Sequence, residues 1–122
     1  MNHTAATRKK HVHGVPNPAT DAVWAHQGGR CAICDGLMER AQGGQARPLG
    51  MTVEHVFPRS QGYGLYANKA LTHWKCNAAR HEAPPTPKML ARVRAMYEAL
   101  LPAATVAALQ GRHPLFPRRG RA

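Results

Sequence analysis

The sequence predicts a small α+β domain, and three features of the chain support this fold class. Residues 51–57 are rich in β-branched and aromatic residues and stop at a proline, which is typical of a strand. After residue 86, apolar residues recur at three- and four-residue steps, which indicates an amphipathic helix. A length of 122 residues suffices for one compact domain and is too short for two ordinary ones.

The domain boundaries follow from charge and composition. Residues 1–16 are basic and lack a hydrophobic period, so we expect a flexible basic arm. Residues 17–110 form the predicted folded domain, with a core at 30–85 and C-terminal helices at 86–110. Residues 111–122 place four arginines among prolines and glycines, which indicates a mobile basic tail.

The elements before residue 86 are short. Residues 18–27 predict a helix that the following two glycines stop. Residues 41–50 have the composition of a loop. Beyond the strand at 51–57, residues 70–74 fit either a second short strand or a turn. Residues 76–81 have the composition of a helical turn.

The clearest helix begins after Thr86, a good N-cap residue, with Pro87 at the first helical position. Pro102 interrupts its pattern, and residues 103–110 predict a second helix that Gly111 ends. The predicted apolar face of the first helix comprises Met89, Leu90, Val93, Met96, Tyr97, Leu100 and Leu101.

The charge balance points to a polyanionic partner. Seventeen Lys and Arg residues against six Asp and Glu residues give a formal net charge of +11, which makes nucleic acid the leading partner class. The apolar stretches are too short and interrupted for a membrane span, and the N-terminal region lacks the apolar segment of a signal peptide. We therefore expect a soluble, cytoplasmic protein.

The spacing of cysteine and histidine predicts a metal centre. Two residues between ligands let both side chains of a pair turn toward one ion, and four N/S ligands complete the tetrahedral shell of structural zinc. His26 or His81 could replace His73 as the fourth ligand. The competing interpretation is a redox CxxC pair with a buried third cysteine, which the lack of a βαβ pattern disfavours. The predicted zinc ligands are Cys31, Cys34, His73 and Cys76.

The residues between these two pairs resemble a known nuclease pattern. A CxxC pair, an acidic residue followed by His, an Asn, and a Cys-Asn in this order resemble the HNH endonuclease family, also called the ββα-metal or His-Me finger fold. The residues that carry the pattern are Glu54, His55, Asn68, Cys76 and Asn77. The match covers about residues 30–85 and looks closest to small phage and bacterial nucleases. It implies a ββα-metal core framed by a zinc knuckle, with flanking helices.

The resemblance implies metal-dependent hydrolysis of phosphodiester bonds in DNA, by nicking or double-strand cleavage. His55 would activate water, a role that suits a neutral imidazole at pH 7, and Asn68 would orient His55 through the backbone. Glu54, Asn77 and His81 would hold a divalent cation, Mg²⁺ or Mn²⁺, with Ni²⁺ or Zn²⁺ as alternatives. On a regular strand, however, the adjacent Glu54 and His55 cannot face the same way.

Double-stranded DNA is the implied substrate, with Arg59, Lys75 and Arg80 as DNA contacts and the basic arm and tail as further phosphate contacts. Two departures from the family pattern stand out. Glu54 replaces the usual Asp, and Arg80-His81 stands where many relatives have Lys-Gly. We expect Arg80 to take over the phosphate contact of that Lys. A phage-encoded chain would act in the host cytoplasm, with a terminase as protein partner, as a monomer or a homodimer.

Two other function classes fit parts of the sequence. A zinc-stabilised DNA-binding or packaging accessory protein without catalytic activity would need the knuckle and the charge alone. A zinc-ribbon-like ribosomal or RNA-binding protein would also explain both, but not the placement of the Glu-His and Cys-Asn pairs. Packaging, restriction, homing and competition between bacteria all remain open as biological roles.

Overall fold

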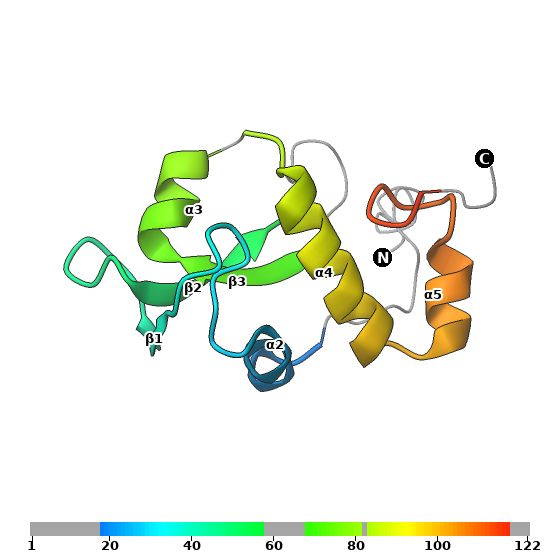
Figure 1. Ribbon diagram of the computed structural model, residues 1–122, viewed down its shortest axis with the longest axis horizontal. Coiled ribbons are helices and arrows are strands. Elements are labelled where there is room, and N and C mark those ends of the chain that lie inside the picture. The colour runs from blue at the N-terminus through cyan, green and yellow to red at the C-terminus, as the bar shows by residue number, and fades with distance from the viewer. Residues whose placement is uncertain (1–17, 58–67, 82, 118–122) are drawn as a thin grey trace, which may run out of the picture.

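The structure is a computed structural model that describes residues 18–57, 68–81 and 83–117. These residues form four helices and a three-stranded mixed sheet, so the predicted α+β class is confirmed (Figure 1). The predicted basic arm and Arg59 lie outside the described residues. The elements in chain order are α2 (Thr20–Gln27), β1 (Glu39–Gln42), β2 (Gly50–His55), β3 (Lys69–His73), α3 (Trp74–Arg80), α4 (Pro87–Leu100) and α5 (Ala103–Leu109).

The sheet has the order β1-β2-β3, with β1 parallel and β3 antiparallel to β2. Glu54 pairs with Ala70, and His55 pairs with Lys69. Because side chains alternate along a strand, Glu54 and His55 lie on opposite faces of the sheet. α3 packs on β2 and β3 from one side, and α2 packs on β3 from the other (Figure 1).

Helix α4 confirms the predicted start and the predicted apolar face. Thr86 is its N-cap, and the Thr86 hydroxyl accepts a hydrogen bond from the Met89 N–H at 3.1 Å. Pro87 occupies the first helical position, where its missing N–H costs no hydrogen bond. The helix packs against α2 and α5. Its buried residues are Met89, Val93, Met96 and Tyr97.

We expect Thr86→Ala to lower the free energy of unfolding by about 1 kcal/mol, because the first turn of α4 loses its side-chain acceptor. Urea denaturation of zinc-loaded protein measures this change. Thr86→Ser, which keeps the hydroxyl, is the control and should retain most of the stability. Equal stability of Thr86→Ala and the unmodified protein would contradict the assigned cap.

The core extends further along the chain than the sequence predicted. Residues 111–117 belong to the predicted mobile tail, yet Leu115 and Phe116 are almost completely buried. The Gly111 N–H donates to the Phe116 carbonyl at 2.7 Å, and Arg94 Nε on α4 donates to the Leu115 carbonyl at 2.7 Å. We call residues 111–116 the C-terminal hook. A composition of Gly, Pro and Arg suggested mobility, whereas two apolar side chains in a tight turn anchor the hook.

The sequence also missed β1 and left β3 undecided. β1 begins at Glu39 and overlaps residues 41–50, which were predicted as a loop. Its four residues are polar or small and mostly exposed, so no hydrophobic alternation marks them as a strand. Close packing fixes the end of β1, since a Cβ on Gly43 would lie 2.5 Å from the Trp74 Cβ. Residues 70–74, which fitted a strand or a turn, belong mainly to β3.

The described helices are either too short or too polar for any of them to serve as a membrane span.

Candidate active site and metal centre

The four predicted zinc ligands meet in one cluster. Their ligand atoms all lie within 4.8 Å of one another, and the cluster consists of Cys31, Cys34, His73 and Cys76. The turn after α2 supplies the first pair, the end of β3 supplies His73, and the first turn of α3 supplies Cys76. His73 Nδ1 lies 3.3 Å from Cys34 Sγ and 3.7 Å from Cys76 Sγ. The chain therefore holds a Cys₃His group that could bind a zinc ion.

The imidazole of His73 is oriented as a metal ligand. Its Nε2 lies 2.7 Å from the Leu37 carbonyl, to which only a protonated nitrogen can donate. In the neutral ring Nδ1 then carries the lone pair, and Nδ1 faces the thiols. Metal-binding histidines commonly use their second nitrogen in this way. His26 and His81, the two alternatives for the fourth ligand, are exposed and lie outside the cluster.

Backbone N–H groups surround the sulfur atoms. Cys31 Sγ accepts from the N–H groups of Ile33 and His73, both at 3.3 Å, and Cys34 Sγ accepts from Gly36 at 3.4 Å. Partial burial raises the pKa of Cys34, but the hydrogen bonds from Gly36 and the other ligands outweigh it and the net shift is downward. Such donors stabilise thiolates, the form of cysteine that binds metal.

The thiol of Cys76 has the opposite shift. Burial and the neighbouring charges of Cys31 and Cys34 raise its pKa to about 12. Three thiolates at this separation repel one another, so the fully deprotonated set needs a cation among them. A zinc ion would supply this positive charge, and its binding would release protons from the thiols.

Asn68 forms hydrogen bonds with the backbone just after His55. Its side chain is fully buried, accepts from the Phe57 N–H at 2.6 Å and donates to the Phe57 carbonyl at 2.9 Å. The Asn68 carbonyl accepts from the Val56 N–H at 2.9 Å. One residue thus holds the backbone N–H groups of Val56 and Phe57 and the carbonyl of Phe57, directly after the end of β2. The resemblance implied a backbone-mediated role of this kind for Asn68.

Glu54 is buried under α3 and paired with Arg80. The Glu54 side chain is 2% exposed and that of Arg80 is 8% exposed. Arg80 Nη1 contacts Glu54 Oε2 and donates to the His55 carbonyl at 3.3 Å, while Nη2 donates to the Val56 carbonyl. Burial raises the pKa of Glu54, and Arg80 opposes that rise. Within the described residues, Glu54 Oε1 and Arg80 Nε have no hydrogen-bond partner.

These contacts give Arg80 a different place from the one that the sequence predicted. The sequence predicted a phosphate contact, but the guanidinium is turned inward onto segment 54–57, because the last turn of α3 lies over β2. Lys75 is exposed on α3, as a DNA contact would be. The Arg80 pairing was missed because only the packing of α3 on the sheet brings two residues 26 positions apart together.

The three predicted ligands of the second metal come from β2, which carries Glu54, and from α3 and its C-cap, which carry Asn77 and His81. Within the described residues, Glu54, His55 and His81 belong to no group of three Cys, His, Asp or Glu ligand atoms within 4.8 Å. His81 is exposed and ends α3 with a left-handed φ of 51°. Asn77 is half-buried one turn earlier on the same helix. The donor types suit a divalent cation, but the contact between Arg80 and Glu54 does not fit one.

Two residues that sequence reasoning did not connect support the start of β3. The Tyr97 hydroxyl accepts from the Lys69 N–H at 2.9 Å, and burial raises the pKa of Tyr97. The Lys69 ammonium donates to the Pro18 carbonyl at 3.0 Å and to the Thr20 hydroxyl at 3.1 Å. Burial lowers the pKa of Lys69. Tyr97 was assigned only to the apolar face of a helix, and its hydroxyl gave no further signal.

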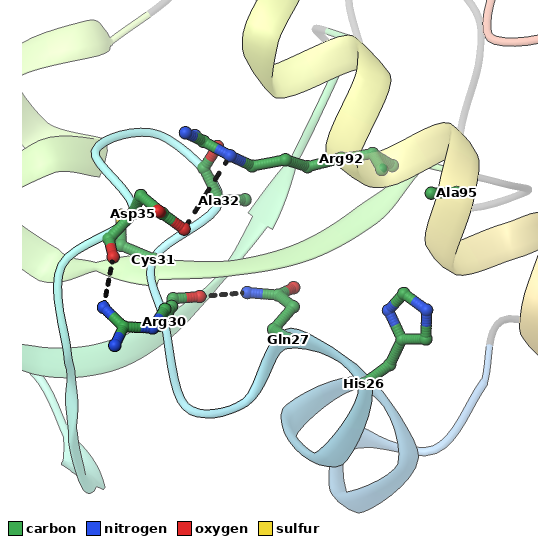
Figure 2. Close-up of a pocket in the computed structure, with 9 residues that line it drawn as sticks. His26, Gln27, Arg30, Cys31, Ala32, Asp35, Arg92 and Ala95 are labelled. Carbon is green, nitrogen blue, oxygen red and sulfur yellow. Dashed lines mark hydrogen bonds and ion pairs between the residues drawn. The ribbon is translucent and has the colours of Figure 1, made fainter.

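A pocket of about 230 Å³ lies beside the knuckle, between α2 and α4 (Figure 2). Arg92 reaches from α4 to the knuckle, where Nη1 donates to the Ile33 carbonyl at 3.1 Å and Nε lies 3.9 Å from Asp35 Oδ1. Arg30 donates to the Asp35 carbonyl at 3.1 Å (Figure 2). Through these contacts Arg30 and Arg92 connect the walls of the pocket. Of the predicted site residues, only Cys31 lines it.

Comparison of the chain with protein-family models finds no match, and comparison with curated protein sequences finds none either.

Proposed function

We propose that the chain is an HNH-type endonuclease that hydrolyses phosphodiester bonds in DNA, with His55 activating the attacking water. In this proposal β2, β3 and α3 form the ββα core, and the Cys₃His cluster is its structural zinc knuckle. Asn68 is the positioning residue for His55. The observation that carries the proposal is the double hydrogen bond between Asn68 and Phe57, two residues beyond His55.

The element order supports this assignment. A strand that ends in Glu54-His55 pairs with a second strand, which runs directly into the helix that carries Asn77. The second strand and the helix contribute to the zinc cluster, since His73 ends β3 and Cys76 lies in the first turn of α3. The resemblance of the sequence involved these same residue types in this order. A net charge of +11 favours a polyanionic substrate.

His55 would act as a general base. It lies at the end of β2, where its imidazole can take a proton from water while that water attacks the phosphorus. Proton transfer of this kind needs the base to stay within hydrogen-bond reach of the water, so the position of the backbone matters. Asn68 and Arg80 hold that backbone from two sides, through Phe57 and through the carbonyls of His55 and Val56.

We expect zinc-loaded protein to convert supercoiled plasmid to nicked circles in Mg²⁺ or Mn²⁺ and not in EDTA. His55→Ala should lower the rate by at least about 100-fold, because it removes the general base. His26→Ala, which truncates an exposed histidine on α2, is the matched control and should retain the rate. Nicking that survives His55→Ala would refute the assigned base.

The buried pair of Glu54 and Arg80 favours one alternative function. If that pair is permanent, the chain binds DNA as a zinc-stabilised accessory protein and does not cleave it. Gel-shift titrations at several salt concentrations separate the two functions when they accompany the plasmid assay. Tight, salt-sensitive DNA binding without nicking in any of the cations Mg²⁺, Mn²⁺, Ni²⁺ or Zn²⁺ would support the accessory function.

A further inference from the structure

We propose that Arg80 competes with a divalent cation for the carboxylate of Glu54, so that a cation gains this ligand only when the guanidinium leaves. The inference rests on the proposed nuclease function and concerns the regulation of that same site. It follows from the position of one positively charged side chain. Arg80 stands against the acidic residue for which the family resemblance implies a metal contact.

The guanidinium is held by acceptors of one short segment. Arg80 contacts Glu54 Oε2 and donates to the carbonyls of His55 and Val56. Three oxygen atoms converge on one cationic group, in a place where the side chain is almost completely enclosed. Convergent carboxylate and carbonyl oxygens are also the donor set that hard divalent cations prefer. A guanidinium and a hydrated divalent cation are therefore both suited to this group of oxygen atoms.

The ion pair of Glu54 and Arg80 leaves buried polar atoms without hydrogen bonds, which weakens it against a competing cation. Within the described part of the chain, Glu54 Oε1 and Arg80 Nε are buried and make no hydrogen bond. The Thr72 hydroxyl lies on the same face of the sheet as Glu54 and helps to lower the pKa of its carboxyl against the rise that burial causes. A buried ion pair repays the cost of desolvation only when its remaining donors and acceptors are satisfied. A cation with its own water ligands would satisfy them better.

Helix α3 places a second oxygen donor beside the pair. Asn77 precedes Arg80 by three residues, and residues at this spacing share one side of a helix. The Asn77 side chain is therefore a neighbour of the side chain that contacts Glu54. With Arg80 withdrawn, Glu54 and Asn77 would offer oxygen ligands from β2 and α3. His81 follows Arg80 as the C-cap residue of the helix.

The test measures Mn²⁺ binding by the loss of the electron paramagnetic resonance signal of free Mn²⁺, with the knuckle zinc-loaded throughout. We expect Arg80→Gln to bind Mn²⁺ more tightly than the unmodified protein by about tenfold or more, because a positive charge next to the carboxylate is gone. Adding Glu54→Gln to Arg80→Gln should abolish this gain. Lys88→Gln, which removes an exposed positive charge on α4, is the matched control and should leave the affinity unchanged.

Equal or weaker Mn²⁺ binding by Arg80→Gln would overturn the proposal, and so would a gain that persists without Glu54. Circular dichroism checks that each variant is folded. If Arg80→Gln does not fold, Arg80→Met decides, because it keeps much of the aliphatic stem of Arg80 and removes the positive charge. Its Mn²⁺ affinity should exceed that of the unmodified protein, and an equal affinity would overturn the proposal. Failure of every protein to nick DNA would refute the nuclease and leave this competition standing.

Discussion

Removal of zinc from the Cys₃His cluster is expected to unfold the described domain. The cluster joins the turn after α2, the end of β3 and the start of α3, so one bound ion would link three separate parts of the chain. Structural zinc contributes roughly 10–16 kcal/mol of apparent binding free energy in small domains, whereas a whole domain is stable by only about 5–15 kcal/mol. Without zinc, the protein would therefore lose a stabilisation comparable to that of the whole domain.

Circular dichroism and thermal unfolding, before and after treatment with a strong zinc chelator, measure this effect. We expect the cooperative transition to disappear and to return on addition of Zn²⁺ but not of Mg²⁺, since thiolates bind the softer ion. Cys76→Ser should behave like chelated protein even in excess Zn²⁺. A cooperative transition at an unchanged temperature in zinc-free protein would contradict the structural role of the cluster.

Asn68→Ala is expected to destabilise the protein by about 1–3 kcal/mol, because it removes two buried hydrogen bonds that are worth about 0.5–1.5 kcal/mol each. These hydrogen bonds join the Asn68 amide to the N–H and the carbonyl of Phe57. The nicking rate should fall as well under conditions in which the variant stays folded. A displacement of the base by about 1 Å is enough to cost roughly 100-fold in rate.

Urea denaturation and the plasmid assay test both parts of this prediction. Asn68→Asp separates the two hydrogen bonds. Its carboxylate can still accept from the Phe57 N–H, but it cannot donate to the Phe57 carbonyl, which then faces a second acceptor. Gln42→Ala removes an exposed amide on β1 and should change the stability by no more than about 0.5 kcal/mol. Unaltered stability of Asn68→Ala would show that the hydrogen bonds between Asn68 and Phe57 do not hold segment 54–57.

The features that the sequence predicted well are those with a local chemical signature. The spacing of Cys31 and Cys34 and of His73 and Cys76 indicated the ligand set before any fold was known, because two-residue gaps are enough to aim both side chains at one ion. Helix α4 was equally readable, since its cap and its apolar period lie within one continuous stretch. In both cases neighbouring residues carry the whole signal.

The features that it missed depend on distant parts of the chain. Strand β1 is polar and exists because it pairs with β2, which no local pattern reveals. The contact of Arg80 with Glu54 depends on the rotation of α3 over the sheet, so a basic residue at the end of a helix looked like a surface contact. The C-terminal hook resembled a mobile tail because its burial depends on partners such as Arg94.

The C-terminal hook also bears on the order in which the protein is assembled during synthesis. The ring of His113 packs edge-on against Phe57, with 5.9 Å between centroids, and Phe57 adjoins the residues that Asn68 and Arg80 hold. Chains emerge from the ribosome N-terminus first. His113, the packing partner of Phe57, is therefore synthesised more than fifty residues after segment 54–57. The proposed catalytic base is translated in the middle of the chain, but its surroundings are completed among the last parts of the described core.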